Sequence, residues 1–208
     1  IGTQAGKGIT TGNQNIAIGA DAMNSGTGQI TGDNNIAIGT SALDAVTSGH
    51  DNIGIGHEAH TRLTTGIHNI ALGFNAHAQN AVTGNYNVAI GFFALGDDAG
   101  GSNNVAIGYT AGRDQIGVSG SVYIGENAGH SVSTGQQNIA IGKDAMNGGT
   151  VTGYNNIAIG VKAGDALTSG YRNVFVGQNA GGAAQGADFN TAVGDNALAP
   201  NKNGQYNA

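Results

Sequence analysis

The chain repeats one short phrase at a nearly constant interval. "NQNIAIGADAM" (13–23) returns as "DNNIAIGTSAL" (33–43) and again as "QQNIAIGKDAM" (136–146). The glycine that closes "IAIG" recurs every 17 residues, with an interval of 18 or 20 at three places. An interval this short and regular predicts a solenoid in which each copy forms one coil. These glycines are Gly2, Gly19, Gly39, Gly56, Gly73, Gly91, Gly108, Gly125, Gly142, Gly160, Gly177 and Gly194.

Each copy places branched apolar residues one and three positions before this glycine, as Ile16 and Ile18 stand before Gly19. Alternate residues of a strand point to the same face, and β-branched side chains suit a pleated, half-buried surface. The pattern therefore predicts a strand that buries these two residues. The residue between them, usually Ala, is expected on the opposite face. A second Ala stands three residues after every one of these glycines, which indicates close contact with another backbone.

Two turn signals divide each copy. The closing glycine marks one corner, because glycine readily adopts a positive φ. A Thr-Gly or Ser-Gly pair upstream, such as Thr65-Gly66, marks the other. Seventeen residues with two corners leave no room for paired helices, so each coil should contain a strand, a corner, a short second strand and another corner.

We therefore predict an all-β parallel β-solenoid of about twelve 17-residue coils. Coils spaced by about 4.8 Å would form a rod on the order of 50 Å long. The array fills residues 1–208 as a single domain, and we expect it to be truncated within the array at both ends, since it starts at "IG" and stops at "YNA".

An asparagine recurs four residues before the closing glycine, with Ser121 as the one substitute. Identical amides stacked from coil to coil can form a side-chain ladder and can also bond to the local turn. We assign this ladder to Asn15, Asn35, Asn52, Asn69, Asn87, Asn104, Asn138, Asn156, Asn173 and Asn190.

Composition excludes several classes of function. Charged residues make up 10% of the chain and the formal net charge is −6, which argues against binding to nucleic acid or to an anionic membrane. No apolar run approaches the roughly 18 residues that a membrane-spanning helix needs. The chain has no cysteine, so its stability does not depend on disulfides.

A coil of this size has little core of its own. Burial of two Ile side chains contributes roughly 3–6 kcal/mol, whereas ordering each residue's backbone costs about 1–2 kcal/mol. We therefore predict self-association, with the Ala of the strand or the Ala that follows the corner at the contact.

The repeats "TGNQNIAIGADAM" (11–23), "TGYNNIAIGVKAG" (152–164) and "TGNYNVAIGFFAL" (83–95) resemble those of bacteriophage tail fibres. They are also similar to repeats in the heads of YadA-like trimeric autotransporter adhesins. The resemblance covers essentially the whole chain. It implies a left-handed β-roll, a homotrimeric fibre, and an extracellular location on a virion tail fibre or a cell surface.

The residues in this chain that could carry out chemistry are its acidic residues and histidines. Asp97 and Asp114 occupy equivalent positions in neighbouring coils, and we interpret them as solvated loop acids rather than as a catalytic pair or a Ca²⁺ site. His60 and His77 share a position four residues after the glycine that is never charged. They are expected either to face a contact between chains, where they could bind a metal, or to be ordinary hydrogen-bonded or surface histidines. We assign no catalytic residue, no cofactor and no metal site.

Four rings follow the closing glycine in successive coils: His57, Phe74, Phe92 and Tyr109. They form a possible recognition surface for sugar rings or for a partner. The alternative is that they stack on one another and stabilise neighbouring coils.

The sequence therefore favours a structural and adhesive fibre segment, which is a rigid spacer that contributes to host attachment and is not an enzyme. A host glycan or protein receptor is a further expected partner. An ice-binding solenoid and an autotransporter adhesin head are the alternatives.

Overall fold

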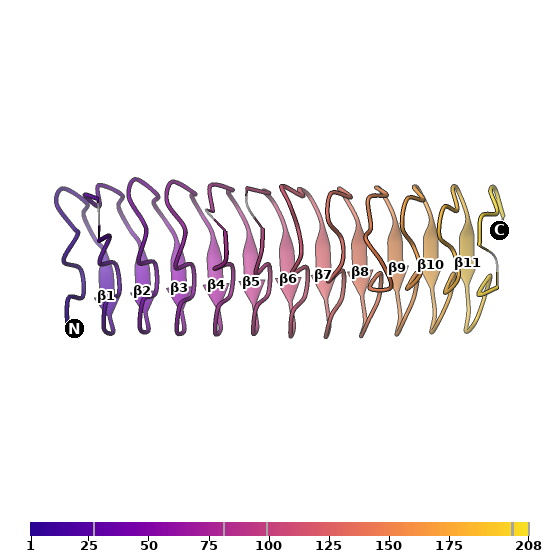
Figure 1. Ribbon diagram of the computed structural model, residues 1–208, viewed down its shortest axis with the longest axis horizontal. Coiled ribbons are helices and arrows are strands. Elements are labelled where there is room, and N and C mark those ends of the chain that lie inside the picture. The colour runs from indigo at the N-terminus through magenta and orange to yellow at the C-terminus, as the bar shows by residue number, and fades with distance from the viewer. Residues whose placement is uncertain (27, 81, 99, 201, 208) are drawn as a thin grey trace.

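The computed structural model describes residues 1–26, 28–80, 82–98, 100–200 and 202–207, and it shows a long rod (Figure 1). One coil follows another along the rod, and each coil contributes one strand to a single 11-stranded sheet. Every strand pairs in parallel with the strand of the next coil, in chain order. No helix among the described residues has the length and hydropathy of a membrane span.

The strands coincide with the predicted "IAI" segments. Each has three residues, and equivalent residues pair directly, as Ile16 does with Ile36. The first copy, at Ile1 and Gly2, forms no strand, so the sheet has one strand fewer than the twelve copies in the sequence. The strands are β1 (Ile16–Ile18), β2 (Ile36–Ile38), β3 (Ile53–Ile55), β4 (Ile70–Leu72), β5 (Val88–Ile90), β6 (Val105–Ile107), β7 (Val122–Ile124), β8 (Ile139–Ile141), β9 (Ile157–Ile159), β10 (Val174–Val176) and β11 (Thr191–Val193).

The predicted second strand of each coil is largely absent. Among the described residues, the opposite side of the rod forms only isolated parallel bridges, such as Leu63 with Val82 and Val132 with Val151. Tight turns occupy the rest of each coil. Backbone hydrogen bonds still run from coil to coil there, for example from His60 N to Ala76 O at 3.0 Å. The sheet is therefore one-sided, and turns form the other wall of the rod.

The prediction of which side of each strand points into the core is wrong. The central residue of each strand from β2 to β11 is buried, and Ala37 and Ala89 are fully so. The residues on either side of it, mostly Ile and Val, stay partly exposed, as Ile16 is at 47% and Val193, in the last strand, at 70%. The reason is space, because the sheet and the wall of turns enclose an interior that also holds side chains such as Leu43 and Leu63. A methyl group fits opposite these side chains, whereas a branched chain does not.

Two coils carry a large ring in place of the central Ala, and glycine compensates for its volume. Tyr123 and Phe175 are both fully buried. A Cβ added to Gly129 would overlap the Tyr123 ring, and one added to Gly181 would lie 2.7 Å from the Phe175 ring.

Most other coils place Leu, Met or His at the position of these two glycines, as at Leu43. The coils just before the two rings place Gly112 and Gly164 there, and an added Cβ would lie 2.7 Å from the Tyr123 ring and 3.1 Å from the Phe175 ring. Each ring therefore occupies space that glycines leave free in two coils, which keeps the core closely packed.

The closing glycine is required for two reasons. Gly91 has a φ of 128°, a conformation that side-chain-bearing residues rarely adopt. A Cβ at Gly91 would also overlap the carbonyl oxygen of Gly108 in the next coil. The predicted positive φ at this corner is confirmed, and so is the close approach of two backbones.

Candidate functional site

The residues that flank the central residue of each strand form one continuous, largely apolar surface, which we call the outer sheet face. They are Ile or Val in every strand except for Leu72 and Thr191. None of these residues is buried, and Ile18, Leu72 and Ile107 are 39%, 41% and 37% exposed. The face contains no charged residue, and its one polar residue is Thr191, in the last strand. Soluble monomers rarely expose contiguous apolar patches larger than a few hundred Å². The outer sheet face is therefore the main candidate surface for contact with a partner.

The predicted contact through alanine is wrong. Ala22, Ala59 and Ala94, which follow the corner glycines, are fully buried inside the chain, as is the strand alanine Ala106. They pack against the chain's own interior and cannot reach another copy. The sequence did not reveal this, because both faces of "IAI" are apolar and alternation alone does not say which one points inward.

The predicted asparagine ladder is confirmed and lies at the edge of the core. Asn52 is typical, since its Nδ2 donates to Asn35 Oδ1 at 3.1 Å and to Gly66 O at 2.8 Å. Its Oδ1 accepts from the backbone N of Asn69 at 2.9 Å. Ser121 keeps part of this pattern, because its Oγ accepts from Asn138 N at 3.1 Å. The ladder ties each coil to the next and anchors the adjacent corner, so its role is structural.

The four rings after the closing glycine form a continuous stack at the rim of the outer sheet face. The centroids of His57 and Phe74 lie 5.1 Å apart, those of Phe74 and Phe92 5.3 Å, and those of Phe92 and Tyr109 5.2 Å. The planes of successive rings are within 11° of parallel. The stacking interpretation of these residues is confirmed.

The stacked geometry leaves little aromatic ring face free to bind a sugar ring. Phe74 and Phe92 each turn both ring faces toward neighbouring rings, although they stay 43% and 40% exposed. A sugar ring stacks on an aromatic face, whereas these two residues offer solvent mainly their edges. The stack is therefore better suited to contact with an apolar partner surface than to a row of stacked sugars.

A second set of rings lines the other end of the strands, near the C-terminal part of the rod. Tyr154 stacks on Tyr171 at 5.2 Å, and Phe189 stacks on Tyr206 at 5.0 Å. The guanidinium of Arg172 lies 5.5 Å from the centroid of Phe189, in cation–π geometry. Tyr154 is 44% exposed, so this corner also presents aromatic surface to solvent.

His60 and His77 do not face another chain, as one of the two predictions for them required. Both are fully buried inside the rod, with ring centroids 5.0 Å apart. The alternative, ordinary hydrogen-bonded or surface histidines, is also wrong, since both side chains are buried and neither ring makes a hydrogen bond among the described residues. Burial lowers the pKa of His60 well below 6.5 and that of His77 to about 4, although the Asp98 carboxylate, 3.8 Å from His77 Nε2, opposes the shift.

The loop acids Asp97 and Asp114 share one cation. Arg113 Nε lies 3.5 Å from Asp97 Oδ2 and 3.8 Å from Asp114 Oδ1. Burial raises the pKa of Asp97, while Arg113 opposes the shift. All three side chains are at least one-third exposed, which agrees with the interpretation as solvated loop acids.

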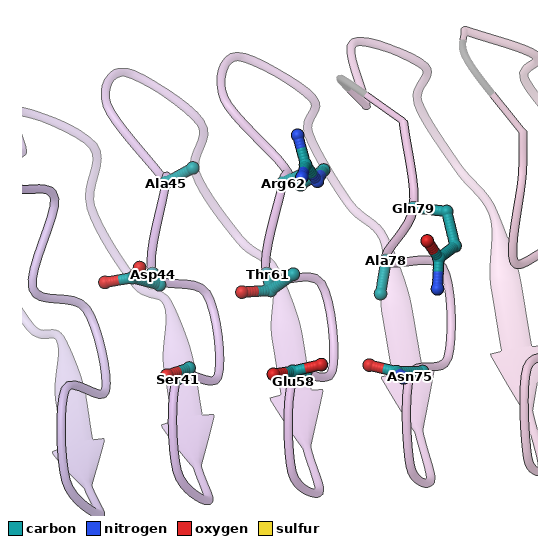
Figure 2. A pocket seen from close by; sticks show the side chains of 9 residues that line it. All are labelled: Ser41, Asp44, Ala45, Glu58, Thr61, Arg62, Asn75, Ala78 and Gln79. Carbon is teal, nitrogen blue, oxygen red and sulfur yellow. The ribbon is translucent and has the colours of Figure 1, made fainter.

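A shallow hollow of about 460 Å³ lies on the wall of turns (Figure 2). Equivalent residues of three coils line it in rows, and one row is Ser41, Glu58 and Asn75. Its charged residues are Asp44, Glu58 and Arg62. Burial raises the pKa of Asp44, followed by repulsion from Asp21. Among the described residues, no hydrogen bond or ion pair joins two of its charged side chains.

Comparison with known proteins identifies no relative: the chain matches no protein-family model, no curated protein and no solved structure.

Proposed function

We propose that the chain is a rigid β-roll segment of an extracellular fibre, with a structural and adhesive rather than a catalytic function. The observation that supports this most is the outer sheet face, an apolar surface without charge that runs along an 11-stranded sheet. A surface of this length and regularity is best matched by another surface of the same kind. The proposed occupant is therefore another copy of the same chain.

Three copies arranged around one axis would cover the outer sheet faces together. Flat faces on three parallel rods can converge on a shared axis, and closed cyclic symmetry prevents further growth sideways. The resemblance of the repeats to tail-fibre and adhesin sequences also favours three chains. In such a fibre, the wall of turns and the loop acids would face outward.

The spacer role follows from the rod, and the adhesive role rests on the resemblance alone. A bacteriophage tail fibre is the first candidate for the parent structure, and the head of an autotransporter adhesin is the second. In either setting the fibre holds a binding surface away from the particle or cell. Its partner there would be a host glycan or protein receptor.

An ice-binding solenoid is the less favoured alternative. Such proteins present a flat, regular array of threonines, whereas the flat face here presents Ile, Val and Leu72, with Thr191 as its one threonine. Thermal hysteresis of the purified chain would favour that function over ours.

The proposal is tested by sedimentation equilibrium of the wild-type chain and of Ile107→Lys. Ile107 is 37% exposed in the single chain, so a lysine there can extend into solvent and leave the coil folded. In an assembly the same lysine would be an unpaired charge in an apolar contact. We expect the mass of three chains for the wild type and a shift towards single chains for the variant.

Ile116→Lys is the matched control. Ile116 is 65% exposed but lies outside the strands, so its replacement should leave the assembly unchanged. A wild-type chain that sediments as a single copy at all concentrations would contradict the proposal. Equal dissociation of both variants would show that the contact lies elsewhere.

A further inference from the structure

One corner of the rod brings together two imidazoles and a carboxylate from successive coils. His50 and Asp51 precede β3, and His68 precedes β4 one coil later. Each side chain offers one ligand atom that lies within 4.8 Å of those of the other two. The sequence does not show this cluster, because the residues are up to 18 positions apart and only the stacking of the coils unites them.

The backbone fixes this meeting point. Asp51 and His68 occupy equivalent positions in adjacent coils, directly before a ladder asparagine, and both adopt left-handed conformations with φ of 58° and 56°. The amide of His68 donates to the carbonyl oxygen of His50 at 3.2 Å. The two coils are thus hydrogen-bonded to each other at the cluster itself.

The side chains are held in place and are open to solvent. His50 Nδ1 lies 2.7 Å from Asp51 Oδ2, and this pairing is the main reason why the pKa of Asp51 is lowered. His68 stacks on Tyr86, with ring centroids 5.1 Å apart. The side chains of His50 and Asp51 are 44% and 37% exposed, so an ion can reach the cluster directly from solution.

We propose that His50, Asp51 and His68 form a surface site for a divalent transition-metal ion, with Zn²⁺ as the best match. Imidazole nitrogen is a preferred ligand of zinc, and a carboxylate completes a three-ligand set that leaves one position for water. Zinc ligands lie about 2.0–2.2 Å from the ion, so modest rotation of exposed side chains would bring the three into range. Two imidazoles make Mg²⁺ and Ca²⁺ poor matches.

Such an ion would join two successive coils through their side chains. All three ligands come from one chain, so the site does not depend on self-association or on the proposed fibre. The nearest comparison is His130, which lies 3.5 Å from Asp114. There the Arg113 side chain also approaches the carboxylate, at 3.8 Å, and its positive charge opposes a metal ion.

The test is a titration of the untagged chain with ZnCl₂ in competition with a chromophoric chelator. The variants His50→Gln, Asp51→Asn and His68→Gln use residues that the array already places at the same positions, in Gln136, Asn34 and Gln137. Each should therefore fold, which circular dichroism can verify. We expect one Zn²⁺ per wild-type chain and a loss of affinity of about tenfold or more in each variant.

His57→Gln and His130→Gln are the matched controls, since both residues lie outside the cluster and should keep wild-type affinity. In parallel, Zn²⁺ should shift the imidazole NMR signals of His50 and His68 in the wild-type chain and leave those of His57 and His130 in place. The proposal is overturned if the wild-type chain binds no Zn²⁺. It is equally overturned if a variant that combines His50→Gln, Asp51→Asn and His68→Gln binds Zn²⁺ as the wild type does, or if His57→Gln costs as much affinity as His68→Gln.

Discussion

Two sets of buried polar side chains in this rod have opposite consequences for its stability. The ladder asparagines are buried with their amides hydrogen-bonded on both sides, as Asn87 is to Asn69, Gly101 and Asn104. His60 and His77 are buried with no hydrogen bond to either ring. A paired buried group contributes to stability, whereas an unpaired one costs about 1–3 kcal/mol. The ladder therefore stabilises the array, and the two histidines weaken it locally.

Because His60 and His77 are buried, we expect the folded chain to lose stability in acid. The unfolded chain protonates them near pH 6.5, whereas burial lowers the pKa of His77 in the fold to about 4. Between these values the unfolded state binds more protons, so the free energy of unfolding should fall as the pH drops from 6.5 towards 4. We expect the variant His60→Leu/His77→Leu to be more stable at pH 7 and to lose less stability in this interval.

Urea denaturation at pH 7.5 and pH 5, at one protein concentration, measures this effect. Leucine is suitable because Leu43 and Leu95 occupy the same position with φ of 51° and 49°. His57→Gln, which changes an exposed histidine, should retain the wild-type pH dependence. An unchanged pH dependence in the double leucine variant would rule out the buried pair as its cause.

At the scale of the single coil, the geometry of the coil depends less on the strand than on the corner glycine that follows it. Each strand has only three residues, and its central residue is limited to the volume that the core allows. The glycine that follows it lets adjacent backbones approach closely, as Gly91 and Gly108 show. Coil geometry therefore depends on the absence of a side chain as much as on the presence of apolar ones.

Alanine substitutions separate the two requirements on this glycine. Gly91→Ala combines backbone strain with overlap on Gly108, whereas Gly194 has a similar φ of 124° but nothing within 4 Å of an added Cβ. We expect Gly194→Ala to lower the free energy of unfolding by about 1–3 kcal/mol from strain alone. Gly91→Ala should cost about 4 kcal/mol or more. Equal losses in chemical denaturation would mean that the contact between backbones adds nothing.

The whole molecule behaves as a one-dimensional stack. Every strand contacts only the strands of adjacent coils, from β1 at one end to β11 at the other. In such arrays stability is approximately a sum of coil and interface terms. Length is therefore adjustable, provided that each residue stays aligned with its equivalents in the neighbouring coils.

Deletion of one complete coil tests this view. Removal of residues 40–56 joins Gly39 to His57 and keeps every later residue aligned with its equivalents, in a part of the rod whose strands carry no core ring. We expect the shortened chain to retain its β-sheet circular dichroism and to unfold at a slightly lower urea concentration. Removal of only residues 40–47 would put His50 and Asp51 into core positions, and that chain should fail to fold. Equal stability of the two deletions would contradict the stack.

The sequence by itself determined the repeat, the strand at each "IAI", the corner glycines and the asparagine ladder. All of these follow from residues that recur at a fixed interval, because equivalent positions in a stack share one environment. The stacking of His57 on Phe74 and the rings beyond it follows for the same reason.

Only the tertiary structure decided which face of the strand points inward. Ala37 and Ile38 are both apolar, so their alternation carries no direction, and the narrow interior selected the smaller side chain. The burial of His60 and His77 and the meeting of His50, Asp51 and His68 also required coordinates. These depend on where side chains from different coils lie in space, which the spacing of residues along one chain does not specify.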